Sequence, residues 1–207
     1  MTFQRKQPQR YCRGLTLTEL LIASVLVGVL TLGAAGVMIG MRKIQGSSRL
    51  SSFLVIHSSA VMAHIQRSVL QATGYQSDPG IILNSGSSPR YYSFRQDTNS
   101  SGTTNNTPAN YADDTWVIYI HDTTAYKLSS CRQAASSGAA PTAACVSGAV
   151  ELTNRVQSLT FTFVADAVNF YVGVNLQTIS NPASAQNPMA NPSYNLATKI
   201  TPTSHTW

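Results

Sequence analysis

The feature that most constrains this chain is an uncharged apolar run at residues 20–41, close to its N-terminus. As an α-helix these 22 residues are long enough to cross the hydrocarbon core of a bilayer, about 30 Å thick. The leader before the run has no acidic residue and carries four basic ones, Arg5, Lys6, Arg10 and Arg13. Glu19 stands at the start of the run, where an unpaired carboxylate is costly in lipid. The sequence therefore predicts a membrane helix with a carboxylate that needs a partner.

Three ordinary kinds of N-terminal signal fit this region less well or only in part. A secretory signal peptide has an apolar core of about 7–15 residues followed by a small-residue cleavage site, and this core is longer. A lipoprotein signal would place its cysteine after the apolar core, whereas Cys12 precedes it. A plain signal anchor fits the length and the charge, with the basic leader kept cytoplasmic by the positive-inside rule. The anchor leaves Gly14 and Glu19 unexplained.

Those two residues carry a resemblance to a known family. The segment at residues 14–23, GLTLTELLIA, resembles the prepilin signal of type IV pilins and type II secretion pseudopilins. The resemblance implies that a peptidase cuts on the cytoplasmic side between Gly14 and Leu15, and that the new N-terminal residue, Leu15, is methylated. The motif covers about 30 residues, and its parts depend on one another. Its fifth-position glutamate falls on Glu19.

The resemblance also assigns roles within the helix. The family's mid-helix glycine falls on Gly28, its usual first residue Phe is replaced by Leu15, and its frequent kinking proline is replaced by Gly36. Glycine weakens a helix without removing a backbone hydrogen bond, so we expect flexibility at Gly28 and Gly36. The family implies that Glu19 pairs with the N-terminal amine of an adjacent subunit. Two opposite charges in an apolar helix bundle are tolerable together and expensive apart.

The net charge of +6 arises mainly from the N-terminal region. Four of the 14 basic residues lie in the leader, and Arg42 and Lys43 mark the end of the apolar run. Beyond Lys43 the chain has eight basic and seven acidic residues. The rest of the protein is therefore near neutral, and no general nucleic-acid binding is expected.

The cysteines are typical of an exported protein. Cys12 belongs to the leader, and Cys131 and Cys145 remain as one pair around a 13-residue loop without core-forming residues. A disulfide across such a loop contributes roughly 3 kcal/mol in the chain-entropy model, and an oxidising compartment forms it. Thiolate metal sites usually have closer spacing and further ligands, so a disulfide is favoured over metal binding.

Beyond the apolar run, the sequence predicts an amphipathic helix at about residues 47–73. Apolar residues recur at helical spacing from Leu50 to Val69, and Ser58 and Gln66 are available for another face. The segment at residues 46–48 is expected to be a soft joint, and Gly74 a stop. His57 and His64 lie two turns apart, which is poor spacing for a metal pair, so we interpret them as ordinary polar positions.

Strand patterns dominate the remainder of the chain. After a loop-rich region at residues 75–110 with one short strand at 91–95, β-branched and aromatic residues predict a strand at 115–121 and a short run at 126–128. Period-two patterns predict a hairpin of residues 159–163 and 169–177, and residues 194–200 an edge strand. The expected fold is α+β, a long N-terminal helix packed on one antiparallel sheet.

No pattern of an enzyme stands out. The chain lacks a nucleophile elbow, a phosphate loop and a zinc signature, and Asp113-Asp114 lacks the ligand spacing of a calcium loop. We therefore expect neither catalysis nor a cofactor nor a metal. The aromatic and basic cluster at residues 90–95 is interpreted as a packed strand, since a base-stacking platform usually comes with a basic groove.

The resemblance implies three parts: a cleaved leader at residues 1–14, a membrane and assembly helix at 15–43, and a periplasmic domain at 44–207 with a β-rich region at about 91–207. It implies single-pass insertion in the bacterial inner membrane, with the N-terminus cytoplasmic. The predicted function is a minor type IV pilin at the initiating tip of the filament. The length, the near-neutral domain and the β-rich region after a long helix resemble the W-type minor pilins and J-type pseudopilins. Major pilins commonly carry their disulfide close to the C-terminus, whereas 62 residues follow Cys145 here. The alternatives are a J-type pseudopilin of type II secretion, or a pilus-displayed adhesin or DNA-binding module.

The same resemblance names the partners. They are the prepilin peptidase and N-methyltransferase, other major and minor pilins that pack helix against helix, and an assembly platform in the inner membrane. The chemistry that the signal implies is carried out on this chain by processing enzymes.

Overall fold

The computed structural model describes residues 15–75, 80–86, 88–99, 103–104, 107, 110–134, 145, 148–165, 170–185, 191–202 and 204–206. The chain forms two compact units, Met1–Ser47 and Ser48–Trp207. The leader with Gly14, most of the loop between the two cysteines, the 166–169 hairpin link and Trp207 lie outside the described residues. Much of the predicted loop at 99–107 lies outside them too.

A single helix, α1, runs from Leu17 to Leu70 without a break. The helix is continuous through residues 46–48, where the Ser47 hydroxyl donates to the Ile44 carbonyl over 2.9 Å, and the softness expected there stays a prediction. The predicted stop at Gly74 was wrong. α1 ends at Leu70, and Gly74 lies in strand β1, Thr73–Tyr75.

The part of α1 in the second unit buries one face. Its buried residues recur three or four positions apart, as helical packing on one side requires: Leu54, Ser58, Val61, Met62, Ile65, Ser68 and Val69. Ser58 was expected on another face, but it is buried because its hydroxyl bonds to that of Thr178 across 2.5 Å. A polar side chain therefore belongs to the buried stripe when a partner lies opposite it.

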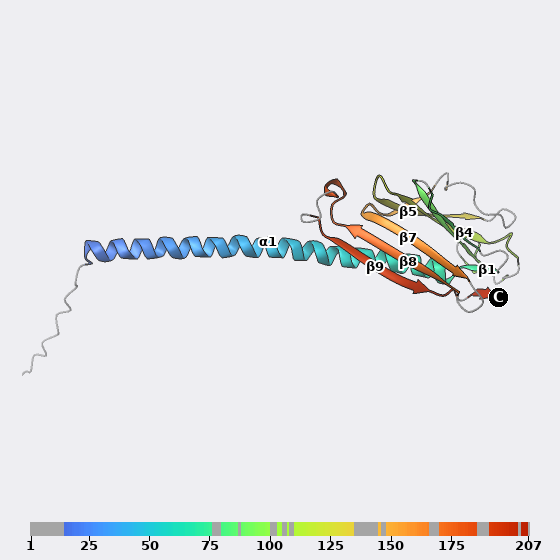
Figure 1. The fold of residues 1–207 in the computed structure, drawn as a ribbon, viewed down its shortest axis with the longest axis horizontal. Helices are drawn as coiled ribbons and strands as arrows, with labels where there is room; N and C mark the ends of the chain where they lie inside the picture. Colours follow the sequence, from blue (N-terminus) through green and yellow to red (C-terminus); the bar gives the residue numbers. More distant parts are fainter. Residues whose placement is uncertain are drawn as a thin grey trace, which may run out of the picture. The chain divides into compact units, whose positions relative to one another are not determined.

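The predicted single sheet is replaced by two antiparallel sheets and a short parallel pair among the described residues. The five-stranded sheet has the order β2 (Ile81–Asn84), β3 (Arg90–Gln96), β4 (Thr115–Asp122), β5 (Lys127–Ala134) and β6 (Val150–Thr153). The three-stranded sheet has the order β7 (Val156–Ala165), β8 (Phe170–Ile179) and β9 (Ser193–Ile200). β1 pairs in parallel with β10 (Ser204–Thr206), and a 3-10 turn, η1, spans Pro182–Ser184. Figure 1 shows β7, β8 and β9 beside the last turns of α1.

The α+β architecture, with a long helix packed on antiparallel sheet, is thus the observed one. The predicted hairpin is confirmed by the pairing of β7 with β8, and the predicted edge strand is β9. The predicted strand at 126–128 extends to Ala134, and β1, β2, β6 and β10 were not predicted. These missed strands are three or four residues long, too short for a period-two pattern to stand out.

The main core lies where the inner faces of the two antiparallel sheets meet each other and α1. Tyr92 of β3 donates through its hydroxyl to the Leu159 carbonyl of β7 over 2.8 Å. The rings of Tyr92 and Phe94 pack on Phe161, with centroids 4.5 and 5.4 Å away. A second, smaller cluster on the opposite face of the five-stranded sheet contains Trp116, Ile118 and Cys131. The aromatic cluster of β3 is therefore packed in the sheet, as interpreted from the sequence.

Gly80 occupies a position that no other residue fits. Its φ of +50° lies in the left-handed region, and a Cβ atom there would fall 1.9 Å from the Thr73 carbonyl oxygen. The Gly80 carbonyl accepts from the Arg95 amide over 2.7 Å. This close approach fixes the entry to β2 against β1.

Candidate functional site

The N-terminal end of α1 begins with a reciprocal pair of hydrogen bonds between Thr16 and Glu19. The Thr16 amide and the Thr16 hydroxyl each lie 2.9 Å from Oε2 of Glu19, and the Glu19 amide donates to the Thr16 hydroxyl over 3.3 Å. The first helical backbone bond follows, from the Leu20 amide to the Thr16 carbonyl. This is a capping box, in which a Thr before the helix and a Glu three residues later satisfy amides that have no helical partner.

This role was not predicted, although its signal is present in the sequence. Thr-x-x-Glu before an apolar run is the usual pattern of a capping box, and Thr16 and Glu19 match it. Leu15, the predicted first mature residue, directly precedes Thr16, and its side chain is 74% exposed. The carboxylate of Glu19 thus bonds to the amide of the residue next to the predicted new N-terminus. Gly14 lies outside the described residues.

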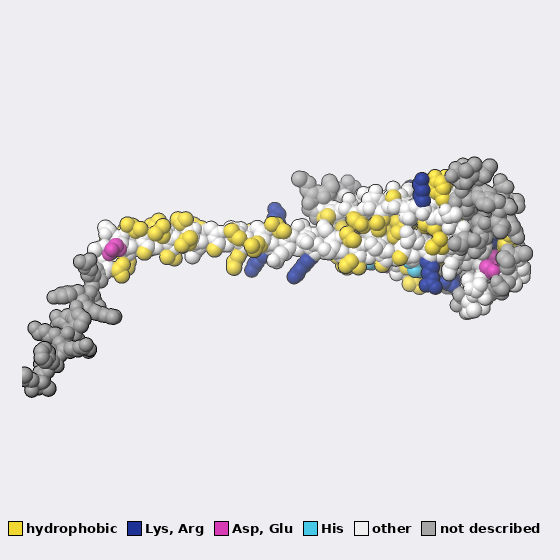
Figure 2. Space-filling model, turned by 90° about the horizontal axis from the view of Figure 1, so that it is seen from below, with side chains coloured by type: hydrophobic (Ala, Val, Ile, Leu, Met, Phe, Trp, Pro, Cys, Tyr) yellow, Lys and Arg dark blue, Asp and Glu magenta, His cyan; other side chains and the backbone are white. Residues whose placement is uncertain are grey.

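The rest of the first unit presents apolar side chains on every side. Large apolar residues from Leu17 to Ile44 are exposed, and Figure 2 shows them along this part of the helix. Contiguous apolar surface of this extent is rare on soluble monomers and marks contact with a membrane or a partner. Among the described residues, α1 is the one helix long and apolar enough to cross a membrane.

The few polar groups within this segment bond to their own helix. The hydroxyl of Ser24 donates to the Leu21 carbonyl over 2.8 Å, and that of Thr31 donates to the Gly28 carbonyl over 2.9 Å. Such bonding satisfies polar side chains in surroundings without water. α1 is continuous through Gly28 and Gly36, where added Cβ atoms would meet no described neighbour within 4 Å. Flexibility at these glycines stays a prediction.

The two predicted cysteines are joined. Cys131 lies in β5 opposite Ile118 of β4, and its disulfide to Cys145 sets their Cα atoms 6.2 Å apart. Cys145 packs with Trp116 and Ile118 on the face of the five-stranded sheet that is turned away from the main core. The disulfide therefore fastens chain from beyond β5 onto that face.

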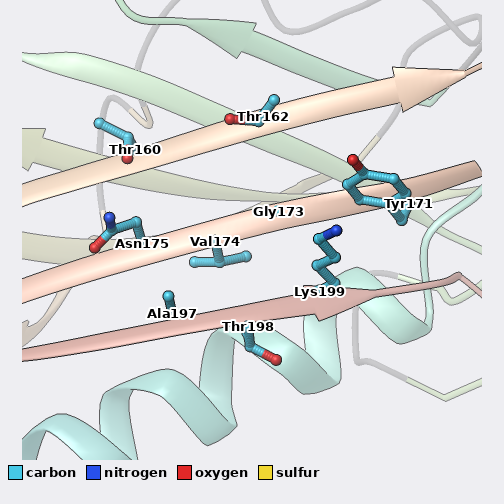
Figure 3. A pocket seen from close by; sticks show the side chains of 9 residues that line it. All are labelled: Thr160, Thr162, Tyr171, Gly173, Val174, Asn175, Ala197, Thr198 and Lys199. Carbon is cyan, nitrogen blue, oxygen red and sulfur yellow. The ribbon is translucent and has the colours of Figure 1, made fainter.

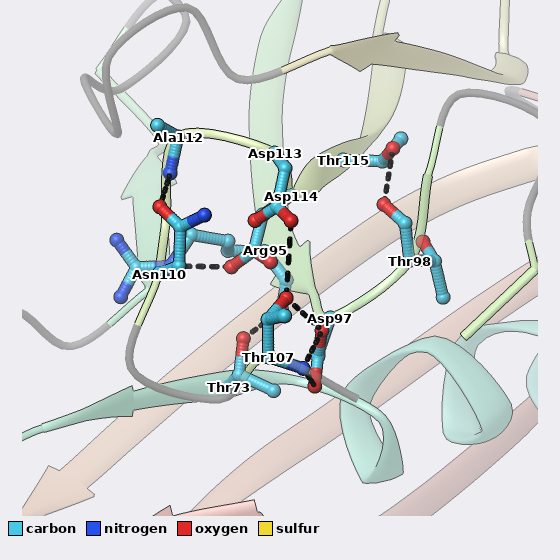
Figure 4. A network of polar contacts seen from close by, with 10 residues as sticks. All are labelled: Thr73, Arg95, Asp97, Thr98, Thr107, Asn110, Ala112, Asp113, Asp114 and Thr115. Carbon is cyan, nitrogen blue, oxygen red and sulfur yellow. Dashed lines mark hydrogen bonds and ion pairs between the residues drawn. The ribbon is translucent and has the colours of Figure 1, made fainter. Parts of the chain in front are cut away.

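A polar network holds the chain between β3 and β4 to the end of the sheet (Figure 4). Nε of buried Arg95 lies 3.6 Å from Oδ2 of buried Asp114, and its guanidinium carbon lies 3.7 Å from the centre of the Tyr111 ring. The Thr107 amide donates to Asp97 over 3.1 Å, and the Thr107 hydroxyl donates to Asp113 over 3.1 Å. Burial raises the pKa of Asp114 to about 6; the charge of Asp97 also raises it, and that of Arg95 opposes both.

The contacts of this network indicate a structural role. The buried cation Arg95 is paired with Asp114, and the carboxylates of Asp97 and Asp113 accept hydrogen bonds from Thr107. In the part of the chain that the structure describes, no group of three or more His, Cys, Asp or Glu side chains is arranged to hold a metal ion. The two helix histidines are engaged separately: His57 stacks on Phe53, and Nδ1 of His64 lies 2.8 Å from the Tyr119 hydroxyl.

An open depression of about 480 Å³ lies over the three-stranded sheet (Figure 3). It lies around Gly173 in β8, where the absent side chain leaves space between Tyr171 and Asn175. Lys199 of β9 reaches over the Tyr171 ring, with Nζ 4.8 Å from its centre. Thr160 and Thr162 border the depression from β7, so its walls are strand side chains without a paired acid and base.

Comparison with known proteins identifies the N-terminal region. Residues 9–35 match the family model described as the prokaryotic N-terminal methylation motif. No curated protein and no solved structure matches the chain. The matched range contains Thr16, Glu19 and the first turns of exposed apolar helix. The chain therefore carries a prepilin-type methylation signal, the kind found in type IV pilins and type II secretion pseudopilins, which supports processing by prepilin peptidase. A single apolar helix near the N-terminus is consistent with anchoring in the inner membrane.

Proposed function

We propose that this chain is a minor structural subunit of a type IV pilus. The observation that carries the proposal is the methylation motif at residues 9–35, followed by a helix whose apolar side chains find no partner within the described chain. Such a surface suits lipid before assembly and neighbouring helices after it. The α+β unit from Ser48 onward supports the role, because it provides a folded domain for display on a filament.

The proposed maturation starts on the cytoplasmic side. Prepilin peptidase removes residues 1–14 by cutting between Gly14 and Leu15, and the amine of Leu15 is methylated. The helix at residues 15–43 then holds the subunit in the inner membrane, with the domain of residues 44–207 in the periplasm. Arg42 and Lys43 lie at the junction between the two parts.

Assembly transfers the helix from lipid into a bundle of N-terminal helices above the inner membrane platform. We propose that Glu19 pairs there with the amine of an adjacent subunit, and that Gly28 and Gly36 let the helix adjust to its neighbours. The capping box holds the Glu19 side chain beside the helix start. A carboxylate fixed at this level favours docking in one axial register.

We assign the subunit to the filament tip, nearest to the W-type minor pilins. The supporting observation is the amount of β-structure, with two antiparallel sheets and a disulfide that is followed by 62 further residues. The J-type pseudopilins of type II secretion share the signal and the helix, and they form the second candidate. Display of a DNA-binding module receives less support, because Tyr92 and Phe94 are buried in the core.

The test is intact-mass and N-terminal analysis of the protein from native membranes and from sheared filaments. We expect a chain that starts at N-methyl-Leu15, with Cys131 and Cys145 two hydrogens lighter than the dithiol. Its presence in sheared pili at low abundance would support the tip assignment. A mature chain confined to membranes of cells that lack pili but secrete through a type II system would favour the pseudopilin. A chain that retains residues 1–14 would overturn both.

A further inference from the structure

A second hollow, of about 210 Å³, lies between the last turns of α1 and the middle of the five-stranded sheet. We call it the basic pocket and define it by His64, Arg67 and Gln71 from α1 and by Ser130 and Arg132 from β5. Val117 of β4 also lines it. Figure 2 shows Lys and Arg side chains close to a His side chain on this unit.

The two arginines of the pocket bring positive charge together from different elements. Arg67 stands in the last turn of α1, and Arg132 follows Cys131 in β5. The ion pairs found among the described residues are Arg95 with Asp114 and Lys127 with Glu151. Neither pocket arginine is therefore paired with a carboxylate of the described residues. Two guanidinium groups that line one cavity without a counter-charge favour an anion between them.

The charge of the two arginines acts on the third titratable group of the pocket. Burial lowers the pKa of His64, and the positive charges of Arg132 and Arg67 lower it further. The pocket therefore holds a positive potential that reaches the imidazole. An anion bound between the arginines would reverse this effect, which makes His64 a reporter of occupancy.

Two residues that line the pocket, His64 and Ser68, are held by hydrogen bonds to Tyr119 before any ligand binds. The buried Tyr119 hydroxyl lies 2.8 Å from Nδ1 of His64 and donates to the Ser68 hydroxyl over 2.8 Å. The ring of His64 is thereby held through Nδ1, which leaves Nε2 as its other nitrogen. On the sheet side, the Cys131–Cys145 disulfide anchors the strand residue between Ser130 and Arg132. A preorganised site binds with less loss of conformational entropy.

We propose that the basic pocket is an oxyanion-binding site, and that its occupant in the assembled filament is a carboxylate side chain of a neighbouring protein subunit. The second clause rests on the proposed function as a filament subunit. The planar forks of two arginines match a carboxylate in geometry and charge. A nucleic acid would require a row of cations along its phosphates, whereas the chain beyond Lys43 has eight basic and seven acidic residues and is near neutral.

The first experiment measures the binding of small anions to the full chain in detergent micelles, by NMR of histidine rings labelled with ¹³C. Glutarate and inorganic phosphate are the probes, and the ring signals of His64 are followed against concentration and pH. We expect saturable shifts at His64 and a rise of its pKa on binding. His57, which stacks on Phe53 outside the pocket, should not respond. Absence of a saturable His64 response to both probes would overturn the proposal.

Matched variants assign the effect to the arginines. The Arg67→Gln/Arg132→Gln double variant should bind glutarate at least about tenfold more weakly, since it loses two charge-assisted contacts. The control, Arg49→Gln/Lys199→Gln, removes the same charge from exposed positions outside the pocket and should bind as the unaltered chain does. Arg67→Lys/Arg132→Lys keeps the charge without the fork and should fall between them. Equal weakening by the control would reduce the effect to net charge and overturn the site.

Two further arms address the occupant. A single-stranded DNA dodecamer should bind no more tightly per phosphate than inorganic phosphate does; tighter binding that disappears in Arg67→Gln/Arg132→Gln would overturn the carboxylate assignment. In cells, Arg67→Glu/Arg132→Glu should be cleaved normally but reduced at least about tenfold in sheared filaments, because like charges then face each other. Unreduced incorporation of this variant would overturn the pocket's role in assembly. Absence of the unaltered chain from filaments would instead overturn the proposed function.

Discussion

The amide and the hydroxyl of Thr16 share one acceptor, Oε2 of Glu19, with both nitrogen and oxygen 2.9 Å away. Glu19 therefore caps its own helix in the isolated subunit. The proposed pairing with the amine of an adjacent subunit would add a second role in the filament. The two roles need different chemistry, since capping requires an acceptor and pairing requires a negative charge.

Glu19→Gln separates these roles. Glutamine keeps an acceptor oxygen for the cap but carries no charge, whereas Glu19→Ala removes both. We expect both variants to be cleaved and to remain in the membrane, with incorporation into sheared filaments reduced at least tenfold, since removing one partner of a buried ion pair costs about 3–5 kcal/mol. Thr16→Val, which keeps the charge, is the control. Normal incorporation of Glu19→Gln beside failure of Glu19→Ala would assign the defect to the cap.

Replacing Gly14 tests the cleavage site. Gly14→Leu places a bulky side chain where the resemblance requires glycine, so we expect the leader at residues 1–14 to remain attached. Leu15→Phe restores the residue usual in the family and should be processed normally. Intact mass of the purified membrane protein distinguishes the two. Mature-size protein from Gly14→Leu would place the cut elsewhere.

Loss of the disulfide should lower the stability of the second unit. Cys131 and Cys145 are 14 residues apart, and closing a loop of this length contributes about 3 kcal/mol in the chain-entropy model. We expect Cys131→Ser/Cys145→Ser and the reduced parent chain to unfold at similarly lowered temperatures in detergent. The double variant should not respond to dithiothreitol. A melting temperature equal to that of the oxidised parent would contradict the prediction.

Asp114 should make part of the stability depend on pH. Its pKa of about 6 in the folded state lies above the usual 3.8, so the folded state binds the proton more tightly. Its contribution to the free energy of unfolding is present below pH 3.8 and is lost as pH rises through about 6. Lowering the pH from 7 to 4.5 should therefore stabilise the parent by about 2 kcal/mol more than Asp114→Asn.

The effect of Asp114 has to be measured as the difference between the parent and Asp114→Asn, because two histidines change the stability in the opposite direction as the pH falls. Burial lowers the pKa of His64 and of His121, so their contributions to stability are lost as pH falls through this range. Both histidines are unchanged in Asp114→Asn, and their effects cancel in the difference. Identical pH profiles of the two proteins, measured by thermal unfolding, would show that Asp114 ionises as an exposed carboxyl does.

The hydrogen bond between Ser58 and Thr178 should behave as a coupled pair. Both hydroxyls are buried, and that of Thr178 also donates to the Tyr194 carbonyl over 3.4 Å. Thr178→Val therefore leaves the Ser58 hydroxyl without its partner, at a cost of about 1–3 kcal/mol, whereas Ser58→Ala should cost less because Thr178 keeps Tyr194. The double variant should lose less than the sum of the two single losses, because it buries no unpaired hydroxyl. Additive losses in a double-mutant cycle of unfolding free energies would show that the bond contributes nothing to the contact between α1 and β8.

The sequence predicted those elements whose patterns extend over many residues. The apolar run and the strands around Val117, Phe161 and Val174 have periods that are long enough to read. The division into two sheets was not predictable, because it depends on which strands pair across the core. Ser58 was placed on the wrong face for a related reason: its partner, Thr178, lies 120 residues away in the sequence.

The functional residues also differ in whether a local sequence pattern revealed them. Glu19 was found because it is a charged residue at the start of an apolar run, and the cysteine pair was found by counting. The capping role of Thr16 was not predicted, although residues 16–19 match the local pattern of a capping box. The basic pocket had no local signal, since Arg67 and Arg132 belong to separate elements and meet only through the packing of α1 on the five-stranded sheet.

The parallel pair of β1 and β10 sets an order on the folding of the second unit. Thr73, Gly74 and Tyr75 follow directly after α1, and they pair with Ser204, His205 and Thr206 at the far end of the chain. Contacts between such distant segments form late, since loop closure precedes any gain from pairing. If the second unit is translocated from its N-terminal side, β1 cannot pair with β10 until residue 206 has emerged. If the proposed export is correct, the unit can be completed only after residues 204–206 have been translocated, and a chain stalled before that point would present the unpaired edge of β1 to chaperones in the receiving compartment.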